Sequence, residues 1–269
     1  MLKRNVGEGS VVKGLDLFKE NFQPFEDCYT VIGGTACSVL MENATLEFRA
    51  TQDIDMILLV DSPRFKEFAD QLLKFIDDGD YTCEERANGT KRLYRFKEPK
   101  TKGFPTMIEL FSRNALNMKG KRRITYVQTD KDPSGLSAML LSDSYYNFAM
   151  QGREKINGIW TLQAPYLIPL KMYAWINLDT EKRNGRTVEE YDLNKHKYDV
   201  FRLLPLVRDG ETVSCNEEIQ KDISKFIDAM NGETLPAEGI FGDWALEEMR
   251  TNFDKDRNLD RLRGIYLRF

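Results

Sequence analysis

The apolar residues of this chain follow two different patterns on the two sides of Pro165. Before it, short apolar runs such as residues 53–60 and 104–112 are bounded by glycine, proline or charged residues, which is typical of strands. After it, apolar residues recur three and four positions apart in four successive segments, which indicates helices. The pattern predicts an α/β unit over residues 1–164 and a helical unit over residues 165–269.

Helices and hairpins are also predicted inside the first unit. The apolar spacing predicts an amphipathic helix over residues 11–22 and a second helix over about 36–46, with Thr35 as its N-cap. A further helix is expected after the turn at residues 61–63, because aromatic and aliphatic residues then fall along one side. Asn-Gly dipeptides between strand-like runs predict two hairpin turns, at Asn88-Gly89 and at Asn157-Gly158.

The composition of the chain speaks against several kinds of functional site. The chain has four cysteines without CxxC spacing, which favours free thiols in a reducing cytoplasm over a disulfide framework or a zinc site. Its single histidine, His196, speaks against a His-rich metal site and a Ser/His or Cys/His nucleophile. No apolar run reaches the roughly 18–20 residues of a membrane span, and no signal peptide is expected. We therefore expect a cytoplasmic protein whose chemistry depends on carboxylates and hard metal ions.

Two aspartates begin an otherwise apolar strand. Asp53 and Asp55 lie two positions apart, so in a strand both side chains project to the same face. Paired carboxylates repel each other, and a divalent cation relieves that repulsion; Mg²⁺ commonly takes one or two carboxylates together with substrate phosphates. Glu109 is the only acid of the apolar segment 104–112, and it is the best candidate for a third carboxylate on an adjacent strand. Three such groups would hold two ions for phosphoryl transfer.

A Gly-Gly pair supplies the complementary feature. Gly33 and Gly34 follow one strand and precede a helix, where free amides at the helix N-terminus can face an anion. An ordinary tight turn is the alternative. Thr35 would cap the helix or donate to a phosphate, and Arg49 would either steady a phosphate or remain solvated at the surface.

Two charged residues of the helical unit are also candidates. Lys171 falls on an apolar helical stripe, so its ammonium either reaches solvent or meets a buried anion. Asp199 precedes Arg202 by three positions, and an intrahelical ion pair is the simpler explanation for it.

Taken together, these segments resemble one family. Gly33-Gly34-Thr35, followed by the segment RATQDID from Arg49 through Thr51 to Asp55, resembles the signature of the nucleotidyltransferase superfamily, and in particular its AbiEii/AbiGii toxin branch. The helix around Lys171 resembles the lysine-bearing helix of that family. The segment KHKYDVFRL at 195–203 resembles its later acidic helix, with Asp199 as the second acid and His196 where an aspartate is common. The resemblance runs from about residue 28 to about 205.

The resemblance implies a mixed sheet flanked by helices, followed by a helical domain that closes the active-site cleft. Asp53, Asp55 and Glu109 would hold two Mg²⁺ ions, and Lys171 and Asp199 would act from the helical domain. The nucleoside triphosphate would be bound by residues of the turn, the strand and the helical domain: Gly33, Gly34, Thr35, Arg49, Thr51 and Lys171.

Two basic stretches flank the strand that carries Glu109. Residues 86–102 carry seven basic residues against one acid, with aromatic residues interleaved, and residues 113–123 carry basic residues only. Such a surface suits a polynucleotide backbone, although an ordinary solvated loop is the alternative. The candidates for RNA contact are Arg92, Arg95, Lys97, Arg122 and Arg123.

The sequence therefore predicts an enzyme, a nucleotidyltransferase that moves NMP from an NTP to RNA, with transfer RNA as the expected acceptor. The resemblance implies a toxin role, in a toxin–antitoxin or phage-defence system with a cognate antitoxin protein as partner. Two alternatives stay open. The acceptor would be a small molecule or a protein in the first, and in the second the chain would bind a nucleotide without transferring it.

Overall fold

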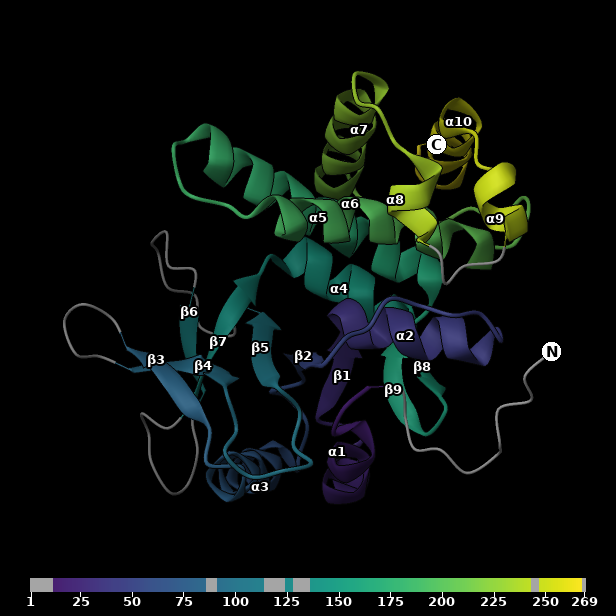
Figure 1. Ribbon diagram of the computed structural model, residues 1–269. Helices are drawn as coiled ribbons and strands as arrows, with labels where there is room; N and C mark the ends of the chain where they lie inside the picture. Colours follow the sequence, from purple (N-terminus) through teal and green to yellow (C-terminus); the bar gives the residue numbers. More distant parts are fainter. Residues whose placement is uncertain (1–11, 86–90, 114–123, 128–135, 243–246, 268–269) are drawn as a thin grey trace. The chain divides into compact units, whose positions relative to one another are not determined.

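The computed structural model describes residues 12–85, 91–113, 124–127, 136–242 and 247–267 (Figure 1). The chain is α+β, with a mixed β-sheet and helices. The strands are β1 (Tyr29–Ile32), β2 (Asp53–Leu58), β3 (Thr82–Glu85), β4 (Lys91–Lys97), β5 (Met107–Arg113), β6 (Ile124–Val127), β7 (Leu136–Leu141), β8 (Arg153–Ile156) and β9 (Ile159–Leu162).

Ten α-helices and two short 3₁₀ segments are found in the described part of the chain. The helices are α1 (Leu15–Phe22), α2 (Gly33–Asn43), α3 (Phe65–Asp78), α4 (Asp143–Gln151), α5 (Ala164–Arg183), α6 (Glu190–Leu203), α7 (Glu217–Asn231), α8 (Ala237–Phe241), α9 (Glu247–Thr251) and α10 (Lys255–Tyr266). Within these residues, no helix is both long enough and apolar enough to cross a bilayer.

The chain divides into two compact units. The first comprises the described residues within 1–38, 50–143 and 155–161, and the second those within 39–49, 144–154 and 162–269. The main change along the chain thus falls at residue 162, close to the predicted boundary at 165. Two earlier segments also belong to the second unit, and no local pattern in the sequence had indicated this.

The sheet of the first unit is built around β2 and β5. Its order is β1-β2-β5-β4-β3, with β7 also pairing with β5 and β6 pairing with β7. β2 runs antiparallel to β1 and parallel to β5. The second edge of β5 is shared, because β4 pairs with residues 107–109 and β7 with residues 111–113. β2 is therefore the central, covered strand that its apolar sequence predicts.

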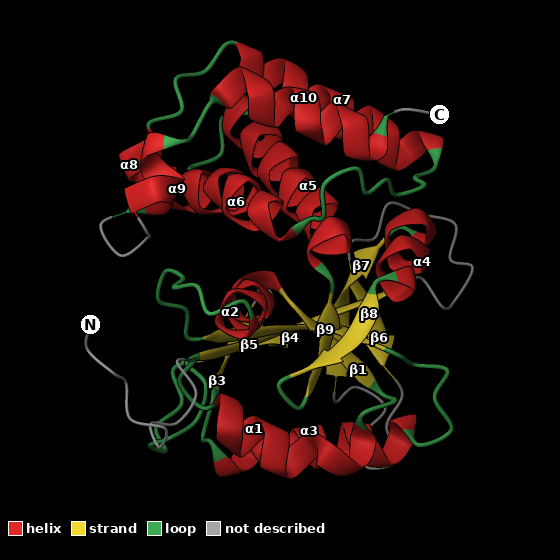
Figure 2. Ribbon diagram, turned by 90° about the vertical axis from the view of Figure 1, so that its right-hand side faces the viewer, coloured by secondary structure: helices red, strands yellow, loops and turns green. Residues whose placement is uncertain are grey.

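Aromatic side chains fill the layer beneath this sheet. α1 and α3 pack against each other and cover one face (Figures 1 and 2). Phe18 and Phe22 of α1 contact Phe75 of α3, with ring centroids 6.1 and 5.3 Å apart, and Phe68 stacks on Tyr29 of β1 at 5.8 Å. These rings are fully or almost fully buried, so each contributes on the order of 2–3 kcal/mol of hydrophobic stabilisation.

The helices of the second unit pack around α5. α5 contacts α6 and α7, α10 contacts α7, and α8 contacts α6 (Figure 2). Side-chain caps define two of the helix starts: the Asn216 side chain accepts a hydrogen bond from Ile219 N at 3.1 Å, and the Asp254 side chain accepts one from Arg257 N at 2.9 Å. The Tyr266 hydroxyl donates to the carbonyl of Pro165 at 2.7 Å, which ties the end of α10 to the start of α5.

Several local predictions are confirmed and others are wrong. The two predicted hairpins are present as β3–β4 and β8–β9, with the Asn88-Gly89 turn outside the described residues. The first helix begins at residue 15 rather than 11. The helix predicted from residue 36 begins at Gly33, so Thr35 lies inside its first turn and is not the N-cap. β6, β7 and α4 were not predicted, because residues 113–153 show mixed periodicity.

Candidate functional site

The candidate site of the first unit lies where β1 leads into α2. Gly33 is the first residue of α2 and has a positive φ of 70°, a conformation that costs a non-glycine residue energy. A Cβ built on Gly33 would overlap the carboxylate of Asp55. The Asp55 side chain therefore lies directly against the backbone of the strand-to-helix turn, and only glycine allows that approach.

The two aspartates have the environment that their spacing predicts. Ile54 and Met56 are completely buried, whereas Asp53 and Asp55 are half-buried. Alternation along β2 thus puts the apolar side chains on the covered face and both carboxylates on the other. Thr35 is buried, and its hydroxyl donates to the carbonyl of Asp53 at 2.5 Å, which joins the first turn of α2 to the start of β2.

Glu109 lies beside Asp55 in the sheet. The parallel register of β2 and β5 pairs Asp55 with Glu109, so both side chains project to the same face. Glu109 is 7% exposed. The antiparallel register of β4 and β5 places Arg95 opposite Glu109, and the Arg95 guanidinium forms an ion pair with the Glu109 carboxylate. Glu109 is therefore close to Asp55 in the sheet, but its carboxylate is paired with Arg95.

The donor chemistry of this site fits a hard cation only in part. Asp53 and Asp55 offer the carboxylate oxygens that Mg²⁺ prefers. Within the described ranges, no three or more aspartate, glutamate, histidine or cysteine side chains form a group that could hold a metal. The site thus fits a cation held by two carboxylates and completed by a substrate, whereas the ion pair with Arg95 stands against Glu109 as a ready third ligand.

A second cluster of charges lies in the helical unit. Asp199 of α6 is completely buried, and it contacts three cations: Arg49, Lys171 and Arg202, whose side chains are 16%, 3% and 6% exposed. Arg49 is bidentate, with Nε 3.0 Å from Oδ1 and Nη2 2.7 Å from Oδ2. Lys171 Nζ lies 2.9 Å from Oδ2, and Arg202 Nη1 lies 2.8 Å from Oδ1. Four donors satisfy the carboxylate, and three positive charges surround one negative charge.

The electrostatics of this cluster follow from its composition. Burial by itself would raise the pKa of Asp199, but the charges of Lys171 and Arg49 and the hydrogen bonds from Arg49 hold that pKa well below its usual range. His196 lies one turn earlier on α6. Burial, with the charges of Lys171 and Lys195, lowers the pKa of His196 to about 3, so its imidazole is neutral at pH 7. Its Nδ1 is buried without a hydrogen-bond partner among the described residues.

The cluster settles three questions that the sequence left open. Lys171 does not reach solvent; it meets a buried anion, and that anion is Asp199. The predicted ion pair between Asp199 and Arg202 is present, as one of three. Arg49 is not free in solvent, because its guanidinium binds Asp199 and its side chain is 16% exposed. Sequence reasoning missed this last contact, since 150 positions separate the two residues and no local signal links them.

The remaining predicted residues have less defined surroundings. Gly34 is the second residue of α2, and Thr51 is half-buried just before β2. Of the predicted RNA contacts, Arg95 binds Glu109 and Lys97 is half-buried on β4. The side chain of Arg92 lies outside the described part of the structure, as do Arg122 and Arg123.

Comparison with protein-family models, curated proteins and solved structures finds no match to this chain. The function is therefore inferred from the residues and their geometry.

Proposed function

We propose that the chain is a Mg²⁺-dependent nucleotidyltransferase that moves NMP from an NTP to an acceptor hydroxyl, with release of pyrophosphate. One observation carries the proposal: the Asp55 carboxylate lies beside Glu109 in the sheet and directly against the glycine turn that begins α2. Carboxylates for a cation and a helix N-terminus for phosphate are thereby brought to one place. The sequence pattern and its resemblance to nucleotidyltransferases support the same reaction.

Each residue of the first unit takes a role in this proposal. Asp53 and Asp55 would hold Mg²⁺, which when bound would neutralise phosphate charge and orient the triphosphate. The backbone amides of Gly33 and of the other residues in the first turn of α2 would donate hydrogen bonds to the phosphates. The acceptor oxygen would attack the α-phosphorus, the bond to pyrophosphate would break, and Glu109 would take the proton of the hydroxyl. Arg95 must release the Glu109 carboxylate for that last role.

The helical unit contributes a positively charged cluster in this proposal. Asp199 would act as a positioning residue, because three of its hydrogen bonds fix the ammonium of Lys171 and the guanidinium of Arg49. Lys171 and Arg49 carry more positive charge than Asp199 neutralises, which suits a unit that works with a polyanionic substrate.

RNA is the proposed acceptor, and transfer RNA in particular. The support is the concentration of basic and aromatic residues in positions 86–102 and 113–123, on both sides of β5 in the sequence. A toxin role, with an antitoxin as partner, rests on the family resemblance.

A second candidate is nucleotide binding without transfer. The ion pair between Arg95 and Glu109 favours this candidate. If the Glu109 carboxylate stays paired with Arg95, it can neither bind a metal ion nor act as the base. A small-molecule or protein acceptor would keep the chemistry and change only the group that is modified.

Labelled nucleotide transfer tests the proposal. The protein is incubated with Mg²⁺, total bacterial RNA and each α-labelled NTP in turn, beside Asp53→Asn/Asp55→Asn. The matched control is Asp77→Asn/Asp78→Asn, which changes two exposed aspartates at the end of α3. We expect label in a discrete RNA band with the wild type and the control only.

The other outcomes separate the candidates. Equal labelling by the Asp53→Asn/Asp55→Asn protein would overturn the proposed site. Pyrophosphate release without labelled RNA would show that the acceptor is a different molecule, and NTP binding without pyrophosphate release would favour the second candidate.

A further inference from the structure

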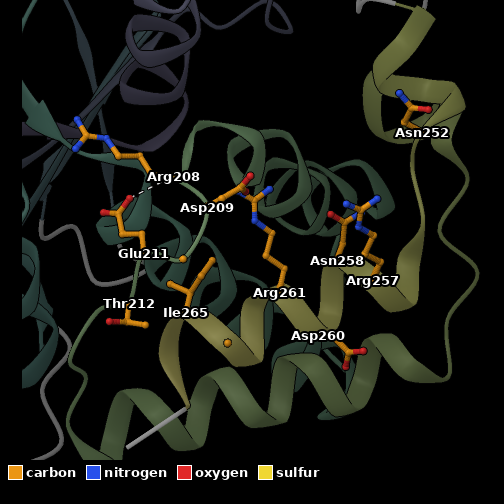
Figure 3. A pocket seen from close by; sticks show the side chains of 12 residues that line it. Arg208, Asp209, Glu211, Thr212, Asn252, Arg257, Asn258, Asp260, Arg261 and Ile265 are labelled. Atoms are coloured by element: carbon orange, nitrogen blue, oxygen red, sulfur yellow. Dashed lines mark hydrogen bonds and ion pairs between the residues drawn. The ribbon is translucent and has the colours of Figure 1, made fainter.

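A cavity in the helical unit contains none of the candidate site residues discussed so far. It has a volume of about 520 Å³ and is lined by residues 208–212, by Asn252 and by α10 (Figure 3). Small-molecule sites commonly measure roughly 300–1,000 Å³. The size of this cavity therefore suits a ligand as large as a nucleotide.

Three contacts fix the walls of this cavity. Arg261 of α10 forms an ion pair with Asp209 at 2.9 Å, and it also donates to the carbonyl of Val207 at 2.6 Å. Val213 N donates to the carbonyl of Ile265 at 2.9 Å. The segment that precedes α7 is thus attached to α10 at both ends, so the cavity is formed before any ligand binds.

The charges of the lining are unevenly matched. Each carboxylate has a partner: Asp209 pairs with Arg261, Asp260 pairs with Arg263 at 2.7 Å, and Glu211 accepts from the backbone N of Arg208 at 3.1 Å. The guanidinium of Arg257, one helical turn before Arg261, makes no ion pair or hydrogen bond with any residue that the structure describes. Arg257 and Arg261 project from the same side of α10 (Figure 3). The Arg257 guanidinium is therefore a candidate for binding an anion.

The asparagine and phenylalanine residues near the cavity indicate what kind of anion would bind there. Asn252 and Asn258 line the cavity, and both also line an adjoining hollow of about 270 Å³. The lining of this hollow includes Phe253 and the buried residues Phe201 and Phe241. Phe253 is half-buried, so part of its ring is accessible. A ligand that spans the two spaces would combine a phosphate, polar groups that hydrogen-bond to asparagine, and a flat ring that packs on phenylalanine.

From this combination we infer that the cavity beside α10 binds a nucleoside phosphate, with Arg257 contacting the phosphate and the adjoining phenylalanine hollow receiving the base. The ligand is a free nucleotide or the terminal nucleotide of an RNA, since both present the same chemistry. The site shares no residue with the carboxylates of β2, and it does not depend on the proposed transfer reaction.

Binding measured without Mg²⁺ tests this inference. Isothermal titration of Asp53→Asn/Asp55→Asn with AMP, ribose 5-phosphate and inorganic phosphate measures this site with the carboxylate site disabled. We expect AMP to bind more tightly than the two smaller probes. Adding Arg257→Gln should weaken AMP binding by about tenfold or more, because a hydrogen bond to a charged group is lost. Arg257 is exposed, so the fold should be retained.

Arg183→Gln is the matched control in the same background, since Arg183 forms an exposed ion pair on α5 away from the cavity, and it should leave AMP binding unchanged. A five-nucleotide RNA distinguishes the two sources: binding at least tenfold tighter than AMP assigns the site to an RNA end, and equal or weaker binding assigns it to a free nucleotide. AMP binding that is no tighter than that of inorganic phosphate, or that is unchanged by Arg257→Gln, overturns the inference.

Discussion

The carboxylates of the two charged regions differ in burial and in hydrogen bonding. Asp199 of the helical unit is completely buried and accepts four hydrogen bonds from three cations. Asp53 and Asp55 of the sheet are half-buried, and the Asp55 carboxylate lies against the glycine turn. A buried carboxylate with four hydrogen bonds holds a structure together, whereas the half-buried aspartates of β2 are the residues that we propose as ligands of a cation. Both kinds of aspartate look alike in the sequence, and only their surroundings separate them.

The largest expected effect comes from removing the buried carboxylate. Asp199→Asn leaves three cations without their counter-charge, and breaking a buried ion pair from one side costs about 3–5 kcal/mol. Urea unfolding at pH 7 should show a loss of that order in the free energy of unfolding. Asp53→Asn is the comparison, and it should lose far less because Asp53 is half-buried. Equal losses in the two variants would contradict the distinction drawn between the regions.

A smaller effect is expected at the glycine turn. Alanine at Gly33 adopts a positive φ, which costs about 1–2 kcal/mol, and its Cβ also displaces the Asp55 carboxylate. Gly103→Ala is the matched control, because Gly103 has a φ of 91° and a Cβ there meets nothing within 4 Å. Both variants should lose stability in urea unfolding, but only Gly33→Ala should also lose nucleotide transfer. Loss of transfer in neither variant would speak against Asp55 as a ligand.

The ion pair of Arg95 with Glu109 should contribute less. Arg95→Gln removes a charged donor from a buried carboxylate, and we expect a loss of about 1–2 kcal/mol in the free energy of unfolding. Arg113→Gln alters a more exposed pair with Asp61, where losses below about 1 kcal/mol are usual. Urea unfolding of the two variants checks the order. A larger loss for Arg113→Gln would show that the pair in the sheet is not structurally important.

A dependence of stability on pH is also expected. The pKa of His196 is lowered to about 3, so below pH 6.5 the unfolded chain takes up a proton that the folded chain does not. The contribution of His196 to stability is therefore complete above pH 6.5 and is lost as the pH falls toward 3. His196→Gln should flatten the slope of unfolding free energy between pH 4.5 and 6.5, which is readily assigned because the chain has one histidine. An unchanged slope would show that the pKa of His196 is not lowered in the folded chain.

The parts that could be predicted from sequence are those set by short-range pattern. Apolar runs and the Gly-Gly pair located β1, β2 and the turn into α2, and the spacing of Asp53 and Asp55 placed both carboxylates on one face. The predicted N-cap at Thr35 is wrong, because α2 begins two residues earlier, at Gly33. The Thr35 hydroxyl instead donates to the carbonyl of Asp53 on β2.

The parts that could not be predicted depend on contacts between distant segments. Glu109 was chosen as a lone acid in an apolar strand, but its ion pair with Arg95 follows from the register of β4 on β5, which the sequence does not encode locally. The assignment of Arg49 to the helical unit depends on Asp199 in the same way. In the described part of residues 113–153, the short strands β6 and β7 are followed closely by the helix α4, so no single periodicity extends over the range.

The most direct test of the central claim is the Mg²⁺-dependent part of NTP binding. Each of the four NTPs is titrated into the wild type, Asp53→Asn/Asp55→Asn and Asp77→Asn/Asp78→Asn, with and without Mg²⁺. We expect Mg²⁺ to strengthen the binding of at least one NTP to the wild type and to the control, and we expect this gain to be absent when Asp53 and Asp55 are replaced. The same gain in all three proteins, or a gain in none, would contradict the claim that these two aspartates form the site.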